Sequence, residues 1–343
     1  WWYYAEKVKK AKYALDDELL RPYFKLENVQ QAAFDVATKL WGISFHQRDD
    51  IPLYHPDVTV FEVKEADGTH IGLLMTDYHP RASKGNGAWA GSFRKQSRRG
   101  GQMVTPIIYN VFNFTTPTAD TPALISLDEV ETLFHEFGHG LQGLLSNCQY
   151  NQLSGTAVAR DYVELCSQIM ENWAEEPEVL KSYAIHWQTG EPIPAELIDR
   201  IQMASKFNQG FITVEYLAVC YLDMDWHTIG DAKLRSVKDF ENASMARIGL
   251  IPEIVPRYRS SYLKHSFVWG YHAGYYNYIW AEVIDADAFQ AFKETSLFDQ
   301  ETAAAFRENI LSTGGTEDPM TLYLRFRGHE PEIAPLLKRR GLD

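Results

Sequence analysis

The sequence contains two histidines four residues apart, with a glutamate directly after the first: His135, Glu136 and His139. In an α-helix, residues i and i+4 lie one turn apart on the same face, so both imidazoles can reach one ion. A catalytic zinc site takes three protein ligands, often imidazole nitrogens, and keeps its fourth position for water. The same pattern also occurs by chance, where the histidines are polar residues of a surface helix. A third ligand is therefore needed.

We expect that ligand on the next polar helix, which is predicted over residues 161–173. Glu164, Gln168 and Glu171 recur there along one stripe of an otherwise apolar segment. On an isolated helix such a stripe would be a solvated face. Beside a helix with two histidines, Glu164 is the better candidate for a ligand. The sequence thus predicts one Zn²⁺ ion held by His135, His139 and Glu164.

The predicted ion indicates hydrolysis of a peptide bond. Zinc lowers the pKa of bound water towards about 7 and polarises a carbonyl group. We expect Glu136 to take the proton of this water as general base and to pass it to the leaving amine. The negative tetrahedral intermediate then needs hydrogen-bond donors around its oxygen. Tyrosine hydroxyls are dense in residues 258–278, the tyrosine segment, although some of these rings must be core aromatics.

The helix that must position the two histidines is predicted over residues 127–146. Ser126 and Glu129 form a capping box, in which each side chain bonds the backbone N–H of the other residue. Apolar residues then recur at spacings of three and four, as on one face of an amphipathic helix. They are Val130, Leu133, Phe134, Phe137, Leu141, Leu144 and Leu145.

Elsewhere the patterns predict a mainly α chain with a small antiparallel β-sheet. Helical spacing dominates the first forty or so residues, where we expect two helices, and residues 1–56 are assigned to a helical region. The sheet region, residues 57–114, has alternating apolar residues on both sides of the turn Asp67-Gly68, then a predicted loop over 81–101 and a strand over 106–114.

The remaining residues, 115–343, are predicted to form the helical zinc-site region. Clusters of turn-forming residues mark breaks between its helices. These breaks are expected at 151–155, 189–194, 252–256 and 314–319. The sequence contains no internal repeat or low-complexity linker, so we expect a single catalytic lobe over residues 1–343.

Composition limits the partners. The formal net charge of −13 counts against nucleic acid or an anionic membrane as a partner, and leaves short peptides as substrates. No apolar stretch is long enough to span a membrane, so a soluble protein is expected. The 3 cysteines lack metal-binding spacing and are an odd number, which favours a reducing compartment. We expect a cytoplasmic protein, or a periplasmic one if a leader preceded Trp1.

These motifs together resemble the thimet oligopeptidase family of zinc peptidases, in particular its branch of bacterial peptidyl-dipeptidases (dipeptidyl carboxypeptidases). The resemblance rests on residues 135–139, on Glu164 at 29 positions after His135, and on Gly270-Tyr271-x-x-Gly274-Tyr275-Tyr276-x-Tyr278-x-Trp280. Supporting stretches extend over the whole chain, at 10–13, 51–58, 87–89, 154–156, 256–262 and 339–342. The family implies a zincin-like catalytic lobe. Its members are about twice as long, so this chain resembles their carboxyl-terminal half, and the amino-terminal half is an expected partner.

The resemblance also assigns roles by position. It implies that His135, His139 and Glu164 bind the ion and that Glu136 is the base. It implies that Tyr271 and Tyr278 assist the oxyanion and substrate, that His265 is a transition-state histidine, and that Glu171 orients a ligand imidazole from a second shell. Further candidates for substrate binding are Tyr275, Arg259 and Gly155.

Three functions remain open at this point. The first is release of carboxyl-terminal dipeptides, for which the free carboxylate of the substrate needs a donor; the candidates are Arg257, Arg259, Lys264 and Tyr271. The second is internal cleavage of oligopeptides by an enzyme of the same family. The third is a peptide-binding fragment without turnover, against which the intact Glu136 argues.

Overall fold

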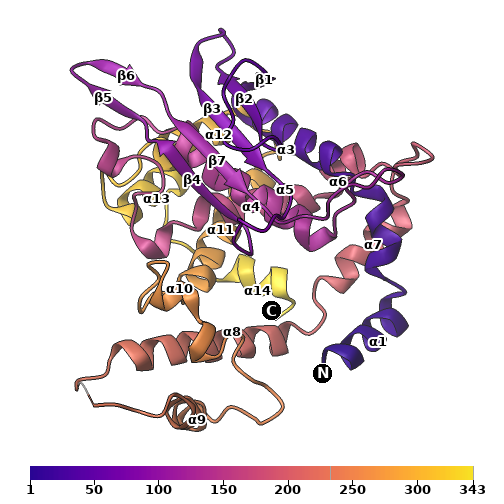
Figure 1. Cartoon of the computed structure of the whole chain (residues 1–343), viewed down its shortest axis with the longest axis vertical. Coiled ribbons are helices and arrows are strands. Elements are labelled where there is room, and N and C mark those ends of the chain that lie inside the picture. The colour runs from indigo at the N-terminus through magenta and orange to yellow at the C-terminus, as the bar shows by residue number, and fades with distance from the viewer. Residues whose placement is uncertain (232, 343) are drawn as a thin grey trace.

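A five-stranded sheet packs against the central helix α4 (Leu127–Leu144) in the computed structural model, which describes residues 1–231 and 233–342 (Figure 1). The strands of this sheet are β1 (Ser44–Gln47), β2 (Thr59–Lys64), β3 (His70–Asp77), β4 (Trp89–Arg94) and β7 (Ile107–Val111). A separate hairpin consists of β5 (Ser97–Arg99) and β6 (Gln102–Val104).

The sheet is mixed, which corrects the predicted antiparallel arrangement. Its order is β1-β2-β3-β7-β4. The turn Asp67-Gly68 makes β2 and β3 an antiparallel hairpin, as predicted. However, β7 runs parallel to β3, with Leu73 opposite Ile107. Parallel neighbours need a crossover of a dozen or more residues. The chain between β3 and β7 is long enough for this, so the strand predicted over 106–114 enters the sheet between β3 and β4.

Strands also occur in two places where the sequence predicted other structure. β1 lies in the region 1–56 assigned to helices, and β4 and β5 lie in the predicted loop over 81–101. Both β1 and β4 are edge strands of the larger sheet. An edge strand is paired on one side only and needs no continuous apolar face. Gly91 and Arg94 interrupt the alternation in β4, and β1 is only four residues long, so no alternation revealed these strands.

The rest of the described chain is mainly helical, as predicted. Its first 41 residues hold α1 and α3 and a short extra turn, α2, rather than only two helices. The predicted breaks coincide with helix ends or with short 3₁₀ turns. Besides α4, the α-helices are α1 (Trp2–Tyr13), α2 (Asp17–Leu20), α3 (Leu26–Trp41), α5 (Leu165–Glu175), α6 (Pro177–Tyr183), α7 (Ala195–Ala204), α8 (Gln209–His227), α9 (Val237–Arg247), α10 (Lys264–Phe267), α11 (Asn277–Glu294), α12 (Gln300–Phe306), α13 (Pro319–Arg327) and α14 (Ala334–Arg340).

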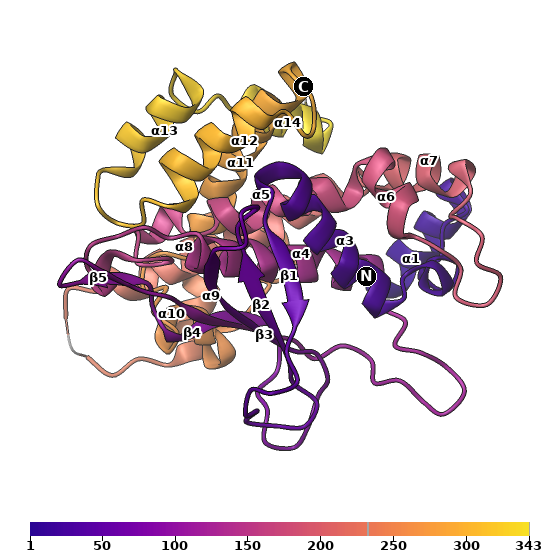
Figure 2. The ribbon, with the colours of Figure 1, turned by 90° about the horizontal axis from the view of Figure 1, so that it is seen from above.

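The core lies between the sheet and the helices that carry the site. It is one large cluster of buried apolar side chains from α3, α4, α5, α11 and the sheet, with Phe134 and Trp173 among the fully buried residues. In the view of Figure 2, α3, α4 and α5 lie close to one another beside the strands. The helix α4 is thus held on several sides, which fixes the direction of its polar residues.

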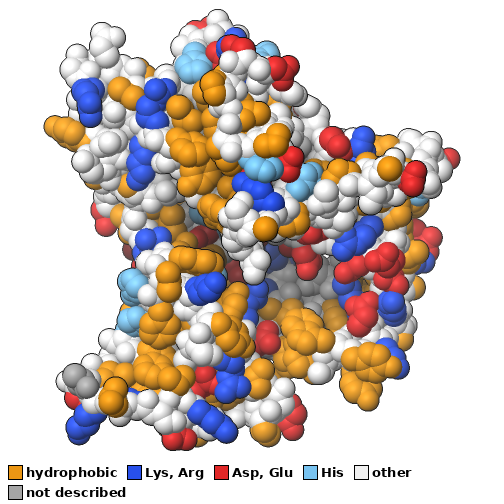
Figure 3. All heavy atoms as spheres, in the orientation of Figure 1, with side chains coloured by type: hydrophobic (Ala, Val, Ile, Leu, Met, Phe, Trp, Pro, Cys, Tyr) orange, Lys and Arg blue, Asp and Glu red, His pale blue; other side chains and the backbone are white. Residues whose placement is uncertain are grey.

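A second, smaller cluster lies apart from this core. It joins α8 to the tyrosine segment through Val219, Cys220, Leu263 and Tyr275. In Figure 1, α8 and α9 lie at the bottom, below α10 and α11. Figure 3 shows the surface hollowed between this unit and the main body. The tyrosine segment therefore connects two differently packed parts of the molecule.

Among the described residues, no helix is long and apolar enough to cross a membrane.

Candidate active site

The helix α4 presents its two histidines on one face. Its first turn is fixed by the predicted capping box: Ser126 Oγ accepts from the Glu129 N–H at 3.2 Å, and Glu129 accepts from the Ser126 N–H at 2.8 Å. The His135 and His139 rings have centroids 5.1 Å apart and are nearly perpendicular, at 86°. Glu136 lies between them in sequence and is 6% exposed.

A glycine of the motif lets the next helix come close. A Cβ added to Gly138 would lie 2.2 Å from the Cys166 carbonyl oxygen and 2.7 Å from the Ser167 Cα. These are backbone atoms and cannot move aside without moving the chain. The start of α5 therefore packs directly on the backbone of α4. This close packing brings Glu164, which precedes α5, to the histidines.

Glu164 completes the predicted set of three ligands. Its Oε2 lies 3.1 Å from His139 Nε2 and 3.3 Å from His135 Nε2, and its side chain is 1% exposed. The Ser167 hydroxyl donates to Oε2 at 2.9 Å, and the Tyr271 hydroxyl donates to Oε1 at 2.7 Å. Both carboxylate oxygens are thus held in fixed directions.

These residues fit a zinc ion. The ligand atoms of the three side chains lie within 4.8 Å of one another. Two ligands at about 2.0 to 2.1 Å from a tetrahedral ion lie about 3.3 Å apart, which matches the carboxylate–imidazole distances here. Two imidazole nitrogens and one carboxylate oxygen are also a donor set that zinc accepts in catalytic sites.

The charges at the site favour a bound cation. Burial alone would lower the pKa of His135, but the Glu164 and Glu171 carboxylates raise this pKa well above its usual value. Burial alone would raise the pKa of Glu164, but the imidazoles of His139 and His135 hold it well below its usual value. Carboxylates that stabilise positive charge at these nitrogens also stabilise a divalent cation placed between them.

Neighbouring residues fix the orientation of the candidate metal-binding side chains. His135 Nδ1 lies 2.6 Å from Glu171 Oε1, the contact expected of a residue that orients a ligand imidazole. The Asn110 amide donates to the Glu136 carbonyl oxygen at 2.6 Å and so ties β7 to α4 beside the site. Burial raises the pKa of Glu136, and the adjacent imidazoles oppose this rise.

The tyrosine segment brings three predicted residues to the site. The Tyr271 and Tyr278 rings are stacked, with centroids 5.6 Å apart and an interplanar angle of 8°. The His265 ring lies 5.8 Å from the Tyr271 ring and 6.3 Å from the Tyr278 ring. Burial raises the pKa of both tyrosines and lowers that of His265. The two phenols therefore remain protonated donors, and the imidazole is neutral at neutral pH.

Two of the substrate-binding candidates are occupied by contacts within the chain. The Tyr275 ring is 4% exposed and packs in the cluster with α8, and its centroid lies 5.7 Å from that of His265 and 5.6 Å from that of Tyr278. This position leaves the ring little surface for contact with a substrate. The Arg259 guanidinium is paired with the Glu241 carboxylate on α9, so its charge is already balanced.

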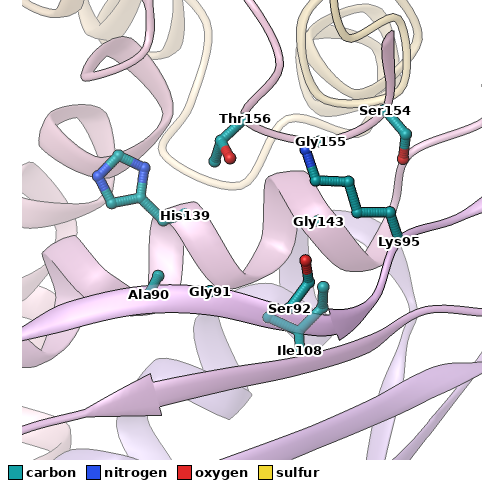
Figure 4. A pocket seen from close by; sticks show the side chains of 10 residues that line it. All are labelled: Ala90, Gly91, Ser92, Lys95, Ile108, His139, Gly143, Ser154, Gly155 and Thr156. Carbon is teal, nitrogen blue, oxygen red and sulfur yellow. The ribbon is translucent and has the colours of Figure 1, made fainter. Parts of the chain in front are cut away.

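The third candidate, Gly155, lines a hollow beside His139 (Figure 4). One side of the hollow is formed by the edge strand β4, and the other by the segment 154–156. The Lys95 side chain extends towards this segment. The residues that line the hollow are Ala90, Gly91, Ser92, Lys95, Ile108, His139, Gly143, Ser154, Gly155 and Thr156.

Comparison with known proteins decides the family. The sequence profile described as Peptidase family M3 matches residues 1–342. The chain belongs to peptidase family M3. Its similarity to named family M3 proteins confirms the resemblance drawn from the motifs, including the branch of dipeptidyl carboxypeptidases. The mainly helical, zincin-like class is confirmed as well.

Three relatives show the extent of the similarity. This family M3 chain is 46% identical over 346 residues to the dipeptidyl carboxypeptidase of Salmonella typhimurium, covering 100% of the chain and 51% of that protein. It is 39% identical over 350 residues to oligopeptidase A of Escherichia coli, covering 99% and 50%. A thimet-like oligopeptidase of Dictyostelium discoideum is 28% identical over 336 residues, covering 96% and 50%. The chain thus spans about half the length of these relatives.

A solved structure supports the fold. The carboxypeptidase of Pyrococcus furiosus superposes with a TM-score of 0.52 at 14% identity, and the match covers 93% of this chain and 58% of that one. At this identity the likeness concerns the fold alone.

Several residues of the site were not predicted from the sequence. Ser167 donates to the Glu164 carboxylate, and Asn110 donates to the backbone of α4; no motif in the sequence marks either contact. The Arg160 guanidinium lies 4.6 Å from the centroid of the Tyr271 ring. Asp223 on α8 accepts hydrogen bonds from the backbone of the tyrosine segment, although about fifty residues separate the two in sequence. Only their contacts in three dimensions identify them.

Proposed function

We propose that this chain is the catalytic part of a zinc metallopeptidase that releases dipeptides from the carboxyl terminus of oligopeptides. The observation that carries this proposal is the convergence of His135, His139 and Glu164, with a buried Glu136 between the histidines. When bound, a zinc ion would polarise the scissile carbonyl and activate the attacking water.

Glu136 is the proposed general base. Its Oε2 is buried and has no hydrogen-bond partner among the described residues, so it is free to accept a proton. Burial raises the pKa of this carboxyl, which makes the carboxylate a stronger base than an exposed one. After accepting the proton of the attacking water, Glu136 can deliver it to the leaving amine.

Tyr271 and Tyr278 are the proposed donors to the oxyanion. Their raised pKa values keep both phenols protonated, which an oxyanion donor requires. The Tyr271 hydroxyl donates to Glu164 at 2.7 Å and is therefore at the edge of the proposed ligand set; its single O–H must turn from Glu164 to donate to the oxyanion. Neutral His265, beside both rings, is the proposed third donor to the transition state.

The substrate backbone is proposed to lie along β4. This strand is at the edge of the sheet, so its outer N–H and C=O groups are unpaired within the sheet. An extended peptide can add to such an edge as a further strand. Ala90, Gly91 and Ser92 line the hollow together with His139, so a peptide bound here would pass beside the ligands.

Sequence similarity is the support for dipeptide release over internal cleavage. The chain is 46% identical to a protein named dipeptidyl carboxypeptidase and 39% identical to one named oligopeptidase A. Arg257, Lys264 and Tyr271 remain candidates for binding the substrate carboxylate, since Arg259 is paired with Glu241. An oligopeptide with a free carboxyl terminus should be cut to release a dipeptide, and amidation of that terminus should remove most of the rate. Equal rates on both peptides, with internal products, would favour the oligopeptidase.

The metal-dependent mechanism is tested with an internally quenched fluorescent peptide. We expect turnover to stop with a zinc chelator, to return with added Zn²⁺, and to fall at least 10³-fold in Glu136→Gln, because the base is lost while the shape is kept. Glu178→Gln, an exposed carboxylate on α6, is the matched control and should leave turnover unchanged. Peptide binding without turnover in the unmodified chain would favour the fragment that only binds.

The proposed peptidase function also indicates which partners and which compartment to expect. Short peptides are the proposed substrates. The relatives contain a further part that this chain does not match. That part is the proposed partner, and it would form the second wall of a substrate channel. The three cysteines are free and buried, which supports the proposal of a reducing, cytoplasmic compartment.

A further inference from the structure

The loop 270–276, which carries Tyr271, is fastened on one side to the helix α8. The Asp223 carboxylate is 1% exposed and accepts two backbone N–H groups of this loop. Its Oδ1 accepts from Ala273 at 3.2 Å, and its Oδ2 accepts from Tyr275 at 2.9 Å. A carboxylate that bridges two N–H groups two residues apart sets the direction of the chain between them.

The same helix also binds the loop at a second point. The Tyr216 hydroxyl, two turns before Asp223 on α8, donates to the Tyr275 carbonyl oxygen. Both backbone polar groups of Tyr275 are therefore bound by α8. His227, one turn after Asp223, has its Nδ1 2.8 Å from the Asp223 carbonyl oxygen and 2.9 Å from Asp223 Oδ1.

The backbone between these bonds is not in a relaxed conformation. Ala273 has φ of 50°, the left-handed region that side chains with a Cβ disfavour. A non-glycine residue keeps such a conformation when its surroundings hold it there. The bond from the Ala273 N–H to Asp223 is one such restraint.

On its other side the loop is fastened to the metal site. The Tyr271 hydroxyl donates to Glu164 at 2.7 Å, the Tyr276 hydroxyl donates to Asp161 at 3.0 Å, and the Asn277 amide donates to the Arg160 carbonyl at 3.1 Å. The loop is thus held between α8 and the segment that precedes α5. The place of the Tyr271 hydroxyl depends on both attachments.

We propose that Asp223 is a positioning residue for the peptidase reaction: it fixes the loop 270–276 from α8 and so sets where the Tyr271 hydroxyl meets the developing oxyanion. This inference rests on the proposed function of Tyr271. Asp223 touches neither the metal ligands nor the hollow beside His139. Its effect on the reaction must therefore pass through the loop.

The test is Asp223→Asn in the full chain. The amide has the shape of the carboxylate but only one acceptor oxygen, so one loop N–H loses its partner. Since a misplacement of about 1 Å can cost about 10²-fold in rate, we expect kcat to fall about 10- to 100-fold, with KM within about twofold. Zinc content, measured by metal analysis, should stay at that of the unmodified chain.

The matched control is Asp225→Asn, two positions away on the same helix. Asp225 binds Ser244 and Arg247 on α9 and does not contact the loop. This variant makes the same change of charge and should keep kcat within about twofold. Tyr216→Phe is a second test if Asp223→Asn fails to fold, because it removes only the hydroxyl bonded to Tyr275. It should lower kcat with KM unchanged.

A double-mutant cycle with Tyr271→Phe separates positioning from general damage. If Asp223 acts through Tyr271, then adding Asp223→Asn to Tyr271→Phe should lower kcat by less than about twofold. Fully multiplicative effects, or wild-type kcat in both Asp223→Asn and Tyr216→Phe, would overturn the proposal.

If Tyr271→Phe alone keeps full activity, the assigned role of Tyr271 fails, and the positioning proposal fails with it. Chelator sensitivity and Glu136→Gln would still report on the metal mechanism independently.

Discussion

At the scale of single residues, the site depends on pairs in which one side chain fixes another. Glu164 is held by Ser167 and Tyr271, and His135 is held by Glu171. Ser167 is three positions from Glu164, whereas Tyr271 and Glu171 are far in sequence from the side chains that they hold. The pairing of His135 with His139 was predictable because their spacing follows the helix period, whereas Glu164 was chosen as an acidic residue of the next predicted helix. The residues that hold these side chains were harder to predict. Glu171 was expected from the family resemblance, whereas no sequence pattern marks Ser167.

Glu171→Gln tests the role of the carboxylate that contacts His135. The amide keeps the shape but loses the charge, so the imidazole becomes a poorer ligand. We expect zinc affinity to fall about 10- to 100-fold. Competition with a chromogenic chelator measures it. Glu178→Gln, exposed on the neighbouring helix α6, is the control. Unchanged affinity in Glu171→Gln would show that the contact at 2.6 Å has no part in metal binding.

Asp77→Asn tests a buried ion pair at the end of β3. The Asp77 and Lys84 side chains are 1% and 2% exposed and lie 2.9 Å apart. Removing one partner of a buried pair leaves the other charge uncompensated, so we expect the free energy of unfolding to fall by about 3 kcal/mol at neutral pH. Urea unfolding measures this change. Glu317→Gln, in an exposed pair with Arg325, should cost less than about 1 kcal/mol.

The same carboxylate gives a pH dependence. Burial alone would raise the pKa of Asp77, but Arg81, Lys84 and Tyr54 lower it to about 2. The folded-state pKa is thus below the unfolded value of about 3.9. The stabilisation is fully present above about pH 4 and is lost as the pH falls towards about 2. Urea unfolding between these pH values should therefore show a shallower loss of stability in Asp77→Asn than in the unmodified chain.

At the scale of elements, the site is the contact between α4 and the start of α5. The capping box and the apolar period predicted α4 almost to its ends. The first turn of the next helix was predicted four residues too early, since a 3₁₀ turn at Arg160–Tyr162 precedes α5. Sequence periodicity does not distinguish such a turn from the helix itself. Edge strands β1 and β4 were missed because only one side of each is paired.

Gly138→Ala tests this contact. The added Cβ would lie 2.2 Å from the Cys166 carbonyl oxygen, so α5 must move and carry Glu164 away from the histidines. We expect a loss of about 1 to 3 kcal/mol in the free energy of unfolding together with weaker zinc binding. Thermal unfolding with and without zinc measures both. Gly210→Ala in α8, where a Cβ meets no atom within 4 Å, should be neutral or slightly stabilising. Normal zinc affinity in Gly138→Ala would contradict this account.

At the scale of the whole molecule, the site joins parts that pack separately. α4 and α5 belong to the large core, whereas Tyr275 belongs to the small cluster with α8. The family resemblance predicted that these segments meet at one site. It could not predict that α8 holds the loop in place, because a hydrogen bond from a helix side chain to a distant backbone has no sequence pattern.

Metal removal should affect the whole fold. Zinc binds the folded arrangement of three ligands and not the unfolded chain, so its binding adds to the free energy of unfolding by mass action. We expect the melting temperature to fall with a chelator and to rise with zinc concentration. His139→Ala should show neither response. A melting temperature independent of zinc in the unmodified chain would contradict the predicted ion.

The mixed sheet also sets an order in which the chain can fold. β2 and β3 are joined by a tight turn, and the capping box lets α4 begin locally. In contrast, the parallel pair of β3 and β7 aligns Leu73 with Ile107, which are 34 positions apart in sequence. The edge strand β4 joins the sheet through β7 alone. Closing such a long loop costs chain entropy before the contact forms. Pulsed hydrogen exchange during refolding should therefore protect the amides of β2, β3 and α4 before those of β4, so the edge proposed to bind substrate would be among the last parts of the sheet to form.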